Sequence, residues 1–242
     1  MAKNHSARTP HALRYLLAAS FLITATAQAA TSAELKVTGR ITPPSCDLTL
    51  DGNGHLDFGE RAFNTLSLDG TKLNEKAIGL QVTCDGATRV GLHVVDNRAS
   101  SKVLKAALNA NAWGSSNALI TDDFIYGLGS VTGAGDTQVP IGGYMFGFKD
   151  ADVTANGSKA YVVYSADKRN WKFDVPQRNY LSPNFTYSFV IGAPSASNYT
   201  PIAITALNGA LTVVPTINRS GDLPTSSAIA FDGSATISLI YL

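Results

Sequence analysis

Apolar and polar residues alternate with a period of two in several segments of this 242-residue chain. The pattern is clearest in AIGLQVTC (77–84), TRVGLHVVD (88–96), FTYSFVIG (185–192) and SATISLIYL (234–242). A period of two is that of a β-strand with one buried face, whereas an amphipathic helix repeats every 3.6 residues. Only the short run at 102–112 has a helical look. The sequence therefore predicts an all-β fold.

The composition agrees with this fold class and excludes some partners. Charged residues make up only 15% of the chain, while 21 glycines and nine tyrosines favour turns and strands. No cluster of Lys or Arg is present, so the chain lacks the basic surface by which proteins bind nucleic acid or anionic lipid.

The N-terminus has the three parts of a secretory signal peptide. Lys3, Arg8 and Arg14 precede an apolar run at 16–27, and an A-Q-A cleavage site ends at Ala29. A membrane anchor is the alternative, but the apolar run is short for a bilayer span. Cleavage would leave 213 residues with sixteen basic and eighteen acidic side chains. No second apolar run in the sequence is long enough to span a membrane.

Export would place the two cysteines, Cys46 and Cys84, in an oxidising compartment. A pair of unrelated buried thiols is the alternative, but an even pair in an exported chain favours a disulfide. The loop between them is close to forty residues long, for which chain entropy predicts a stabilisation of about 4 kcal/mol.

Between the cleavage site and the first cysteine lies an amphipathic segment, AELKVTGRITPPSC (33–46). Every second position is apolar or glycine: Leu35, Val37, Gly39 and Ile41. The positions between them are polar: Lys36, Thr38 and Arg40. Because Pro43 and Pro44 cannot donate ladder hydrogen bonds, the strand should not continue into the following domain. We expect an N-terminal arm at residues 30–45 that seeks an apolar partner surface.

Some strand pairings can also be expected. Residues 48–58 predict a hairpin around the Asp-Gly-Asn-Gly turn. The segments 77–84 and 88–96 read as adjacent antiparallel strands joined at Asp85-Gly86, with Cys84 facing inward. Residues 97–177 form an elaborated region in which further strands are separated by Gly-rich turns.

No catalytic or metal-binding set is evident, so we expect neither an enzyme nor a cofactor. His55 and His93 have no cysteine or carboxylate at triad or metal spacing, and both read as surface histidines. The DGNGHLD stretch lacks the Gly and Glu positions of a calcium loop. Asp122 and Asp123 would point to opposite faces of an extended strand.

Trp113, Trp171 and the tyrosines offer a different possibility, a sugar-binding platform. Aromatic side chains in β proteins are more often part of the core. A carbohydrate-binding surface therefore stays the alternative to a core role.

The two ends of the chain resemble the subunits of chaperone-usher fimbriae. In that family an arm of alternating apolar residues around one glycine precedes the first cysteine, as do Leu35, Val37, Gly39 and Ile41 here. Cys84 in QVTC and the near-terminal Tyr241 in SLIYL also match the family pattern. In length and look the chain is closest to the beta-fimbria-type, fimbria-like proteins. A C-terminal glycine common in the family is replaced by Ile229, and the nearest glycine is Gly233.

The resemblance implies an incomplete immunoglobulin-like β-sandwich at residues 46–242 that lacks one strand. It implies that a periplasmic chaperone pairs with the C-terminal strand, whose inward residues are Ala235, Ile237, Leu239 and Tyr241. At the outer-membrane usher, the arm of another fimbrial subunit would replace the chaperone, and the protein would reach the cell surface in a fimbrium. A fimbrial tip adhesin or a secreted carbohydrate-binding β-sandwich protein is the alternative function.

Overall fold

The structure is a computed structural model that describes residues 32–42, 44–108, 113, 121–149, 152–173, 180–192 and 199–242. The predicted signal peptide, Pro43 and residues 109–112 of the helix-like run lie outside these residues. The chain divides into two compact units, Met1–Ile41 and Thr42–Leu242. In the first unit, residues 32–41 form no regular secondary structure and are exposed.

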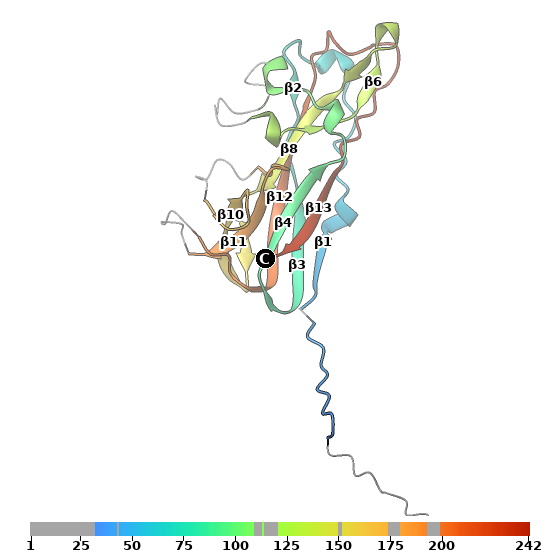
Figure 1. Ribbon diagram of the computed structural model, residues 1–242. Helices are drawn as coiled ribbons and strands as arrows, with labels where there is room; N and C mark the ends of the chain where they lie inside the picture. Colours follow the sequence, from blue (N-terminus) through green and yellow to red (C-terminus); the bar gives the residue numbers. More distant parts are fainter. Residues whose placement is uncertain are drawn as a thin grey trace, which may run out of the picture. The chain divides into compact units, whose positions relative to one another are not determined.

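The second unit is an all-β fold in which every strand ladder is antiparallel. It is a β-sandwich with two layers (Figure 1). One layer is built on the neighbours β1, β3, β12 and β8, with short strands added. Its strands are β1 (Cys46–Leu50), β2 (Thr71–Lys72), β3 (Lys76–Thr88), β5 (Tyr126–Gly127), β8 (Gly142–Phe148), β9 (Thr154–Ala155) and β12 (Ile204–Ile217).

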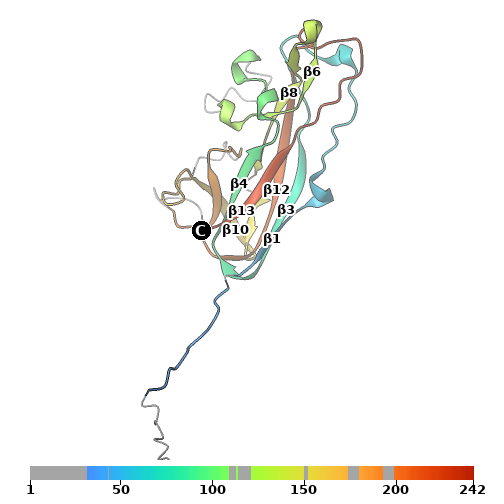
Figure 2. The same cartoon turned by 45° about the vertical axis from the view of Figure 1, so that its right-hand side comes forward.

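The other layer has the order β10-β11-β4-β13. Its strands are β4 (Val90–Asp96), β10 (Ser158–Ser165), β11 (Thr186–Ile191) and β13 (Ala235–Tyr241). The β9–β10 hairpin joins the two layers along one side, since β9 pairs with both β12 and β10. On the other side β1 and β13 lie next to each other in both views (Figures 1 and 2).

Short elements complete the described parts of the chain. Two strands, β6 (Ser130–Thr132) and β7 (Gln138–Pro140), form a small separate sheet. The helices are all 3-10 turns: η1 (Asp51–Gly54), η2 (Phe63–Thr65), η3 (Ala99–Ser101), η4 (Lys105–Ala107), η6 (Asp122–Phe124) and η7 (Ala134–Asp136). No helix in the described residues has the length and apolar character that crossing a bilayer requires.

The core between the layers follows from the alternation in the sequence. In β3 the apolar side chains of Ile78, Leu80, Val82 and Cys84 are buried, while Gln81 and Thr83 are exposed. Inward residues of β4, β11 and β12 meet them in one cluster, as Leu92, Phe189 and Leu207 do. The predicted inward faces of β3 and β4 are confirmed, whereas Ile191, predicted on the same face of β11 as Phe189, is exposed. Together the inward residues give the sandwich one continuous apolar interior.

Two smaller clusters cover outer faces of the sandwich. Met145 of β8 packs with Val103, Leu108, Trp113 and Ile125, all from the segment before β8. This cover explains why every residue of β8 is buried on both faces. On the other layer a cluster of Val163, Trp171 and Val190 lies outside β10 and β11. The elaborated region therefore packs against the sandwich.

Two predicted pairings are wrong. The strands β3 and β4 follow each other in the chain but belong to different layers, because β3 already pairs with β1 and β12 and β4 with β11 and β13. The hairpin at 48–58 is also absent, since β1 pairs with β3 and residues 55–62 form no strand. Leu56 and Phe58 are nevertheless half-buried against the core.

Candidate functional site

The two layers end in the strands β1 and β13, which face each other on one side of the sandwich. β1 pairs with β3, and β13 pairs with β4. Within the described residues, no strand is bonded to the second edge of either one. An unpaired strand edge exposes backbone donors and acceptors and is a template for pairing with another chain. This side of the molecule is therefore the candidate site.

A groove with a cavity volume of about 310 Å³ lies between these edges. Most of its lining is apolar and comes from both layers. One wall contains Leu50, Leu56 and Phe58, the floor contains Ile78, Phe146 and Leu211, and the other wall contains Phe231, Ala235 and Ile237. Apolar surface of this kind costs free energy in water, which burial under another strand would remove.

The register of β13 shows which backbone groups face this groove. The amide of Asn97 donates to the carbonyl of Ser234 at 3.0 Å, and the amide of Leu242 donates to the carbonyl of Arg89 at 3.0 Å. In an antiparallel ladder, the bonded positions alternate along each strand. The even-numbered residues of β13 are thus bonded to β4. Backbone groups directed toward the groove belong to Ala235, Ile237, Leu239 and Tyr241.

The same reasoning applies to β1. The amide of Asp85 donates to the carbonyl of Ser45 at 2.9 Å. In this register, Cys46, Leu48 and Leu50 direct their backbone groups toward the groove. On both edge strands, the residues with outward-directed backbone groups, apart from the exposed Tyr241, also have their side chains turned toward the core. An added strand could therefore form hydrogen bonds and bury apolar side chains at the same positions.

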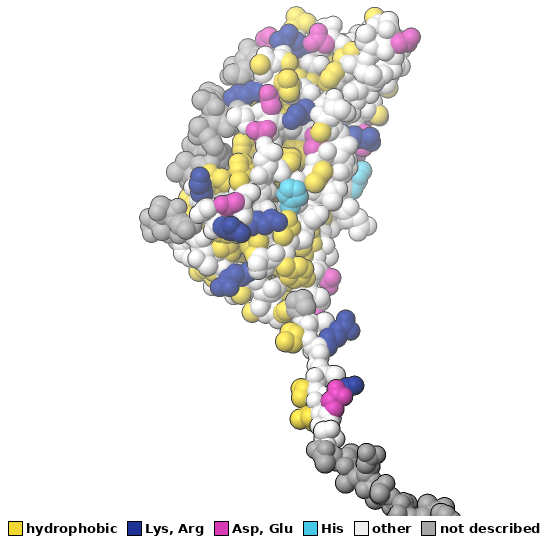
Figure 3. Space-filling model, in the orientation of Figure 1, with side chains coloured by type: hydrophobic (Ala, Val, Ile, Leu, Met, Phe, Trp, Pro, Cys, Tyr) yellow, Lys and Arg dark blue, Asp and Glu magenta, His cyan; other side chains and the backbone are white. Residues whose placement is uncertain are grey.

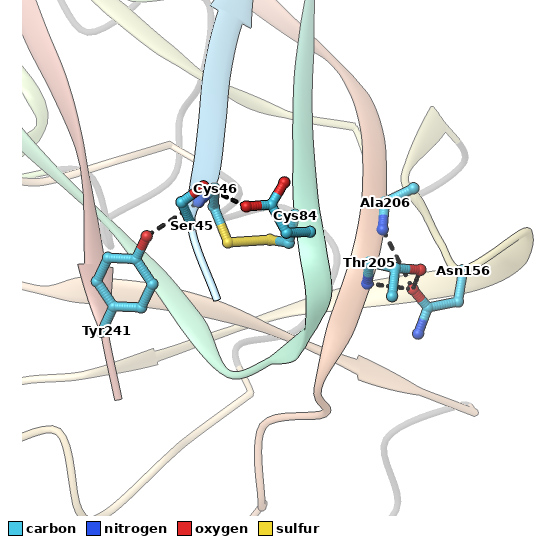
Figure 4. Close-up of a disulfide and its surroundings, with 8 residues drawn as sticks. Ser45, Cys46, Cys84, Asn156, Thr205, Ala206 and Tyr241 are labelled. Atoms are coloured by element: carbon cyan, nitrogen blue, oxygen red, sulfur yellow. Dashed lines mark hydrogen bonds between the residues drawn. A yellow bond between two sulfur atoms is a disulfide. The ribbon is translucent and has the colours of Figure 1, made fainter. Parts of the chain in front are cut away.

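Beyond the residues that line the groove, Tyr241 connects the two edge strands. Its side chain reaches from β13 to β1, where its hydroxyl accepts a hydrogen bond of 3.0 Å from the amide of Cys46 (Figure 4). Beside it lies the disulfide between Cys46 and Cys84, so the predicted bridge is confirmed. These two residues are register partners on β1 and β3. The bridge fixes the first residue of β1 to the layer behind it.

At the other end, side chains from the end of β4 hold the beginning of β13. The Asn97 amide nitrogen Nδ2 donates to Ser234 Oγ at 2.9 Å and to Thr236 Oγ1 at 3.0 Å. The guanidinium of Arg98 forms an ion pair with the carboxylate of Asp232. The groove wall is thus fixed at both ends.

Gly233 and Tyr144 give this part of the groove its shape. A Cβ atom on Gly233 would lie 2.7 Å from Tyr144 Cε1, so only glycine lets the chain pass this ring. Burial raises the pKa of Tyr144, and the carboxylates of Asp96 and Asp232 raise it further. Its hydroxyl therefore stays protonated at neutral pH, in the wall of the groove.

The predicted donor residues lie in the first unit. The exposed fractions of Leu35, Val37 and Ile41 are 87%, 89% and 99%. Gly39 has no atom within 4 Å of the place where a Cβ would stand. Figure 3 shows apolar and charged side chains both standing out from the chain in this segment. Three large apolar side chains without a covering surface are unusual in a soluble protein. The arm has the exposure that a donor strand needs.

The remaining candidates have structural explanations. His93 is half-buried, with Nδ1 3.3 Å from the carbonyl oxygen of Phe185, while His55 is exposed at the groove. Asp122 and Asp123 lie in a 3-10 turn and not in a strand, and Asp122 accepts a hydrogen bond from the Lys105 amide. No group of three metal-ligating side chains occurs among the described residues.

Both tryptophans are core residues, with exposed fractions of 1% for Trp113 and 4% for Trp171. They offer no open indole face for a sugar. Nearby, the carboxylate of Asp167 accepts hydrogen bonds from the backbone amides of Asn170 and Arg169 and from the side chains of Asn170 and Ser165. These bonds lower the pKa of Asp167 and hold the loop after β10.

Sequence reasoning named Tyr241 and Cys46 but not their contact with each other. It missed Asn97 and Arg98, which hold the beginning of β13. The one available signal was the alternation in residues 234–242. That pattern shows which residues face inward but not which strand lies opposite.

Comparison with known proteins gives sequence similarity over nearly the whole chain. A family model described as "Protein of unknown function (DUF1120)" matches residues 35–144, from the arm into β8, which is somewhat less than half of the chain. The Escherichia coli (strain K12) protein described as "Uncharacterized protein YhcF" is 25% identical over 95% of this chain and 99% of its own. "Protein GltF" of the same organism is 27% identical over 88% of this chain and 89% of its own. These descriptions state no activity, so the functional argument rests on the groove and the arm.

Proposed function

We propose that this protein is a structural subunit of a chaperone-usher fimbria that polymerises head to tail by donor-strand exchange and supports surface adhesion. One observation carries the proposal. An apolar groove lies between two edge strands, and the edge residues that line it, Leu50, Ala235 and Ile237, also have backbone groups that no strand of the described residues pairs with. This arrangement is suited to binding an extended strand and not a small molecule.

The energetics of strand addition favour this reading. Backbone hydrogen bonds supply affinity in β-strand addition, and pockets for alternate side chains supply specificity; pilin complementation by a chaperone strand is one of the known examples. Full burial of one Val, Leu or Ile side chain is worth about 1.5–3 kcal/mol. The arm offers three such side chains, Leu35, Val37 and Ile41. All three have odd residue numbers and therefore lie on one face of an extended strand.

The partners follow from the need to keep the groove covered. During export a periplasmic chaperone would lend a strand to β13, and the outer-membrane usher would be the place where the arm of another subunit replaces it. An arm on one surface and a groove on another form a heterologous contact, which produces an open fibre when the rotation does not close a ring. The finished protein would lie in a fimbrium on the cell surface.

Deletion of residues 30–42 tests the proposal. The deleted chain keeps β1, β13 and the disulfide, so it should still form a complex with the chaperone. It should no longer join onto a preceding subunit, because it cannot donate a strand. A matched variant with Lys36→Ser keeps all apolar arm residues and should still assemble. Normal fibre growth by the deleted chain would refute the donor role.

A further inference from the structure

The η1 turn that follows β1 has an unusual main chain. Its sequence is Asp-Gly-Asn-Gly, and three of its four residues have positive φ: 53° at Gly52, 54° at Asn53 and 79° at Gly54. Glycine adopts this conformation without strain, and asparagine is one of the few other residues that tolerate it. All four residues are exposed. The turn therefore has little packing to hold its main chain in place.

Asn53 is one of three asparagines that a glycine follows in this chain; the other two are Asn156 and Asn208. Asparagine before glycine is chemically labile, because the glycine nitrogen can approach the side-chain carbon Cγ without obstruction by a Cβ. The nitrogen gives up its proton to water and forms a bond to Cγ. The bond from Cγ to Nδ2 then breaks, and Nδ2 leaves as ammonia. The product is a cyclic succinimide.

Water opens the succinimide in one of two ways. When the bond from the ring nitrogen to Cγ breaks, the product is aspartate. When the bond from this nitrogen to the main-chain carbonyl carbon breaks, the product is isoaspartate, whose main chain runs through Cγ and is longer by one carbon. In sum, asparagine and water become an acid and ammonia, and the reaction needs neither an oxidant nor a reductant.

The side chain of Asn156 is fixed by hydrogen bonds that oppose this reaction. Its Oδ1 accepts from the amides of Thr205 at 2.8 Å and Ala206 at 3.3 Å (Figure 4), and its Nδ2 donates to the carbonyl of Ala203 at 3.0 Å. To form the ring, the side chain must turn toward the nitrogen of Gly157, which breaks these bonds. The fold therefore protects Asn156 although its φ is also positive, at 50°.

Asn208 is protected through its main chain. It lies inside β12, and its register partners are Gln81 of β3 on one side and Thr154 of β9 on the other. Its side chain is exposed, so exposure alone does not distinguish it from Asn53. Ring closure requires rotation about the bond between Cα and the carbonyl carbon, and the ladders on both sides oppose this rotation.

Asn53 has neither restraint. No hydrogen bond joins its side chain to another residue in the described part of the chain. Its main chain lies outside the strand ladders, between two glycines. A Cβ on Gly52 would meet no described atom within 4 Å, so the turn borders open space on this side. The side chain of Asn53 is therefore free to turn toward the nitrogen of Gly54.

We infer that Asn53 is a site of spontaneous covalent modification, at which water converts the asparagine through a succinimide to aspartate and isoaspartate, while the fold protects Asn156 and Asn208. This inference does not depend on the proposed function. The modification adds a carboxylate to the turn after β1. Isoaspartate also lengthens the main chain between Leu50 and His55, which both line the groove.

Peptide mapping of the full, oxidised chain tests the inference. The folded protein is kept at mildly alkaline pH, and samples taken over time are reduced and digested with trypsin. The three sites fall in separate peptides, 41–61, 150–159 and 179–219, in which mass spectrometry with fragmentation locates each change from amide to acid. Asn53 should react at least about tenfold faster than Asn156, since ring closure at Asn156 costs several hydrogen bonds. Asn208 should also stay largely unchanged.

The controls separate the effect of the fold from that of the sequence. In concentrated guanidinium chloride the three sites should react at similar rates, because each has glycine as its next residue. An Asn53→Gln variant keeps an amide but needs a larger ring, and its peptide 41–61 should not change in mass. Equal rates at the three sites in the folded chain, or an Asn53 that reacts only in denaturant, would overturn the assignment. Aspartate without isoaspartate at residue 53 would overturn the route through the succinimide.

Discussion

The disulfide makes a prediction about stability that can be worked out from the structure. Cys46 and Cys84 join the first residue of β1 to β3, with a sequence separation of 38 residues. β1 is only five residues long, and β3 is its one partner among the described strands. In a Cys46→Ser/Cys84→Ser variant, this strand loses its covalent attachment and one wall of the groove loses its anchor.

The expected magnitude comes from the entropy of loop closure. A cross-link over 38 residues removes conformational freedom from the unfolded chain that corresponds to about 4 kcal/mol at 25 °C. Natural domains are stable by about 5–15 kcal/mol, so this loss is a large fraction of the total. The cost of the two serine hydroxyls is smaller: Cys46 is half-buried at the end of the strand, and one hydroxyl at the buried position of Cys84 costs about 1 kcal/mol.

Urea unfolding at neutral pH, followed by tryptophan fluorescence, measures the change. The free energy of unfolding of the double variant should be about 4 kcal/mol lower than that of the oxidised wild type. Reduced wild type should match the variant, while the variant itself should not respond to reductant. A loss below about 1 kcal/mol would show that the bridge does not limit the unfolded chain as reasoned.

Two further predictions concern the interior and the groove wall. Burial raises the pKa of Tyr126 and of Tyr187 above the usual value of 10.0. Above pH 10 the unfolded chain therefore loses protons that the folded chain keeps, which lowers the stability of the fold. The urea midpoint, measured from pH 8.5 upward, should fall beyond pH 10. A Tyr126→Phe variant should show a shallower fall, although loss of its 3.1 Å bond to the Leu181 carbonyl costs about 1 kcal/mol at neutral pH. Gly233→Val should lower the free energy of unfolding by about 1–3 kcal/mol, because the new side chain meets Tyr144. An unchanged urea midpoint for Gly233→Val, or a stability that does not fall above pH 10, would contradict these arguments.

Faces of strands could be read from the sequence because burial imposes a period of two. The inward positions of β3 and β4 were predicted correctly, and on β13 Ala235, Ile237 and Leu239 do pack against the core. Tyr241 was also predicted to face inward, but it is 50% exposed and reaches across to β1. The neighbour with which each strand pairs could not be predicted in the same way, since alternation shows only which face of a strand is buried. This is why β3 and β4 were paired wrongly and the segment with Leu56 and Phe58 was taken for a strand.

Only two parts of the candidate site could be predicted from the sequence. The exposed arm with Leu35, Val37 and Ile41 and the apolar C-terminal strand are both visible in the sequence. That the second wall is β1 depends on the order of strands in each layer, which long-range packing decides. The contact between Tyr241 and Cys46 joins residues 195 positions apart, and no local pattern encodes it.

In the proposed assembly, the alternation of the arm specifies the register in which it would lie in the groove. A shift by one residue would turn Lys36, Thr38 and Arg40 toward the apolar floor, because each residue changes face. Burying two unpaired cations there is far more costly than any gain in backbone bonds. A shift by two residues keeps the faces but brings Gly39 to a position that Val37 or Ile41 would otherwise fill, so that one large apolar side chain is lost from the contact. The alternation thus excludes odd shifts and the place of Gly39 opposes even ones, so that one register is favoured.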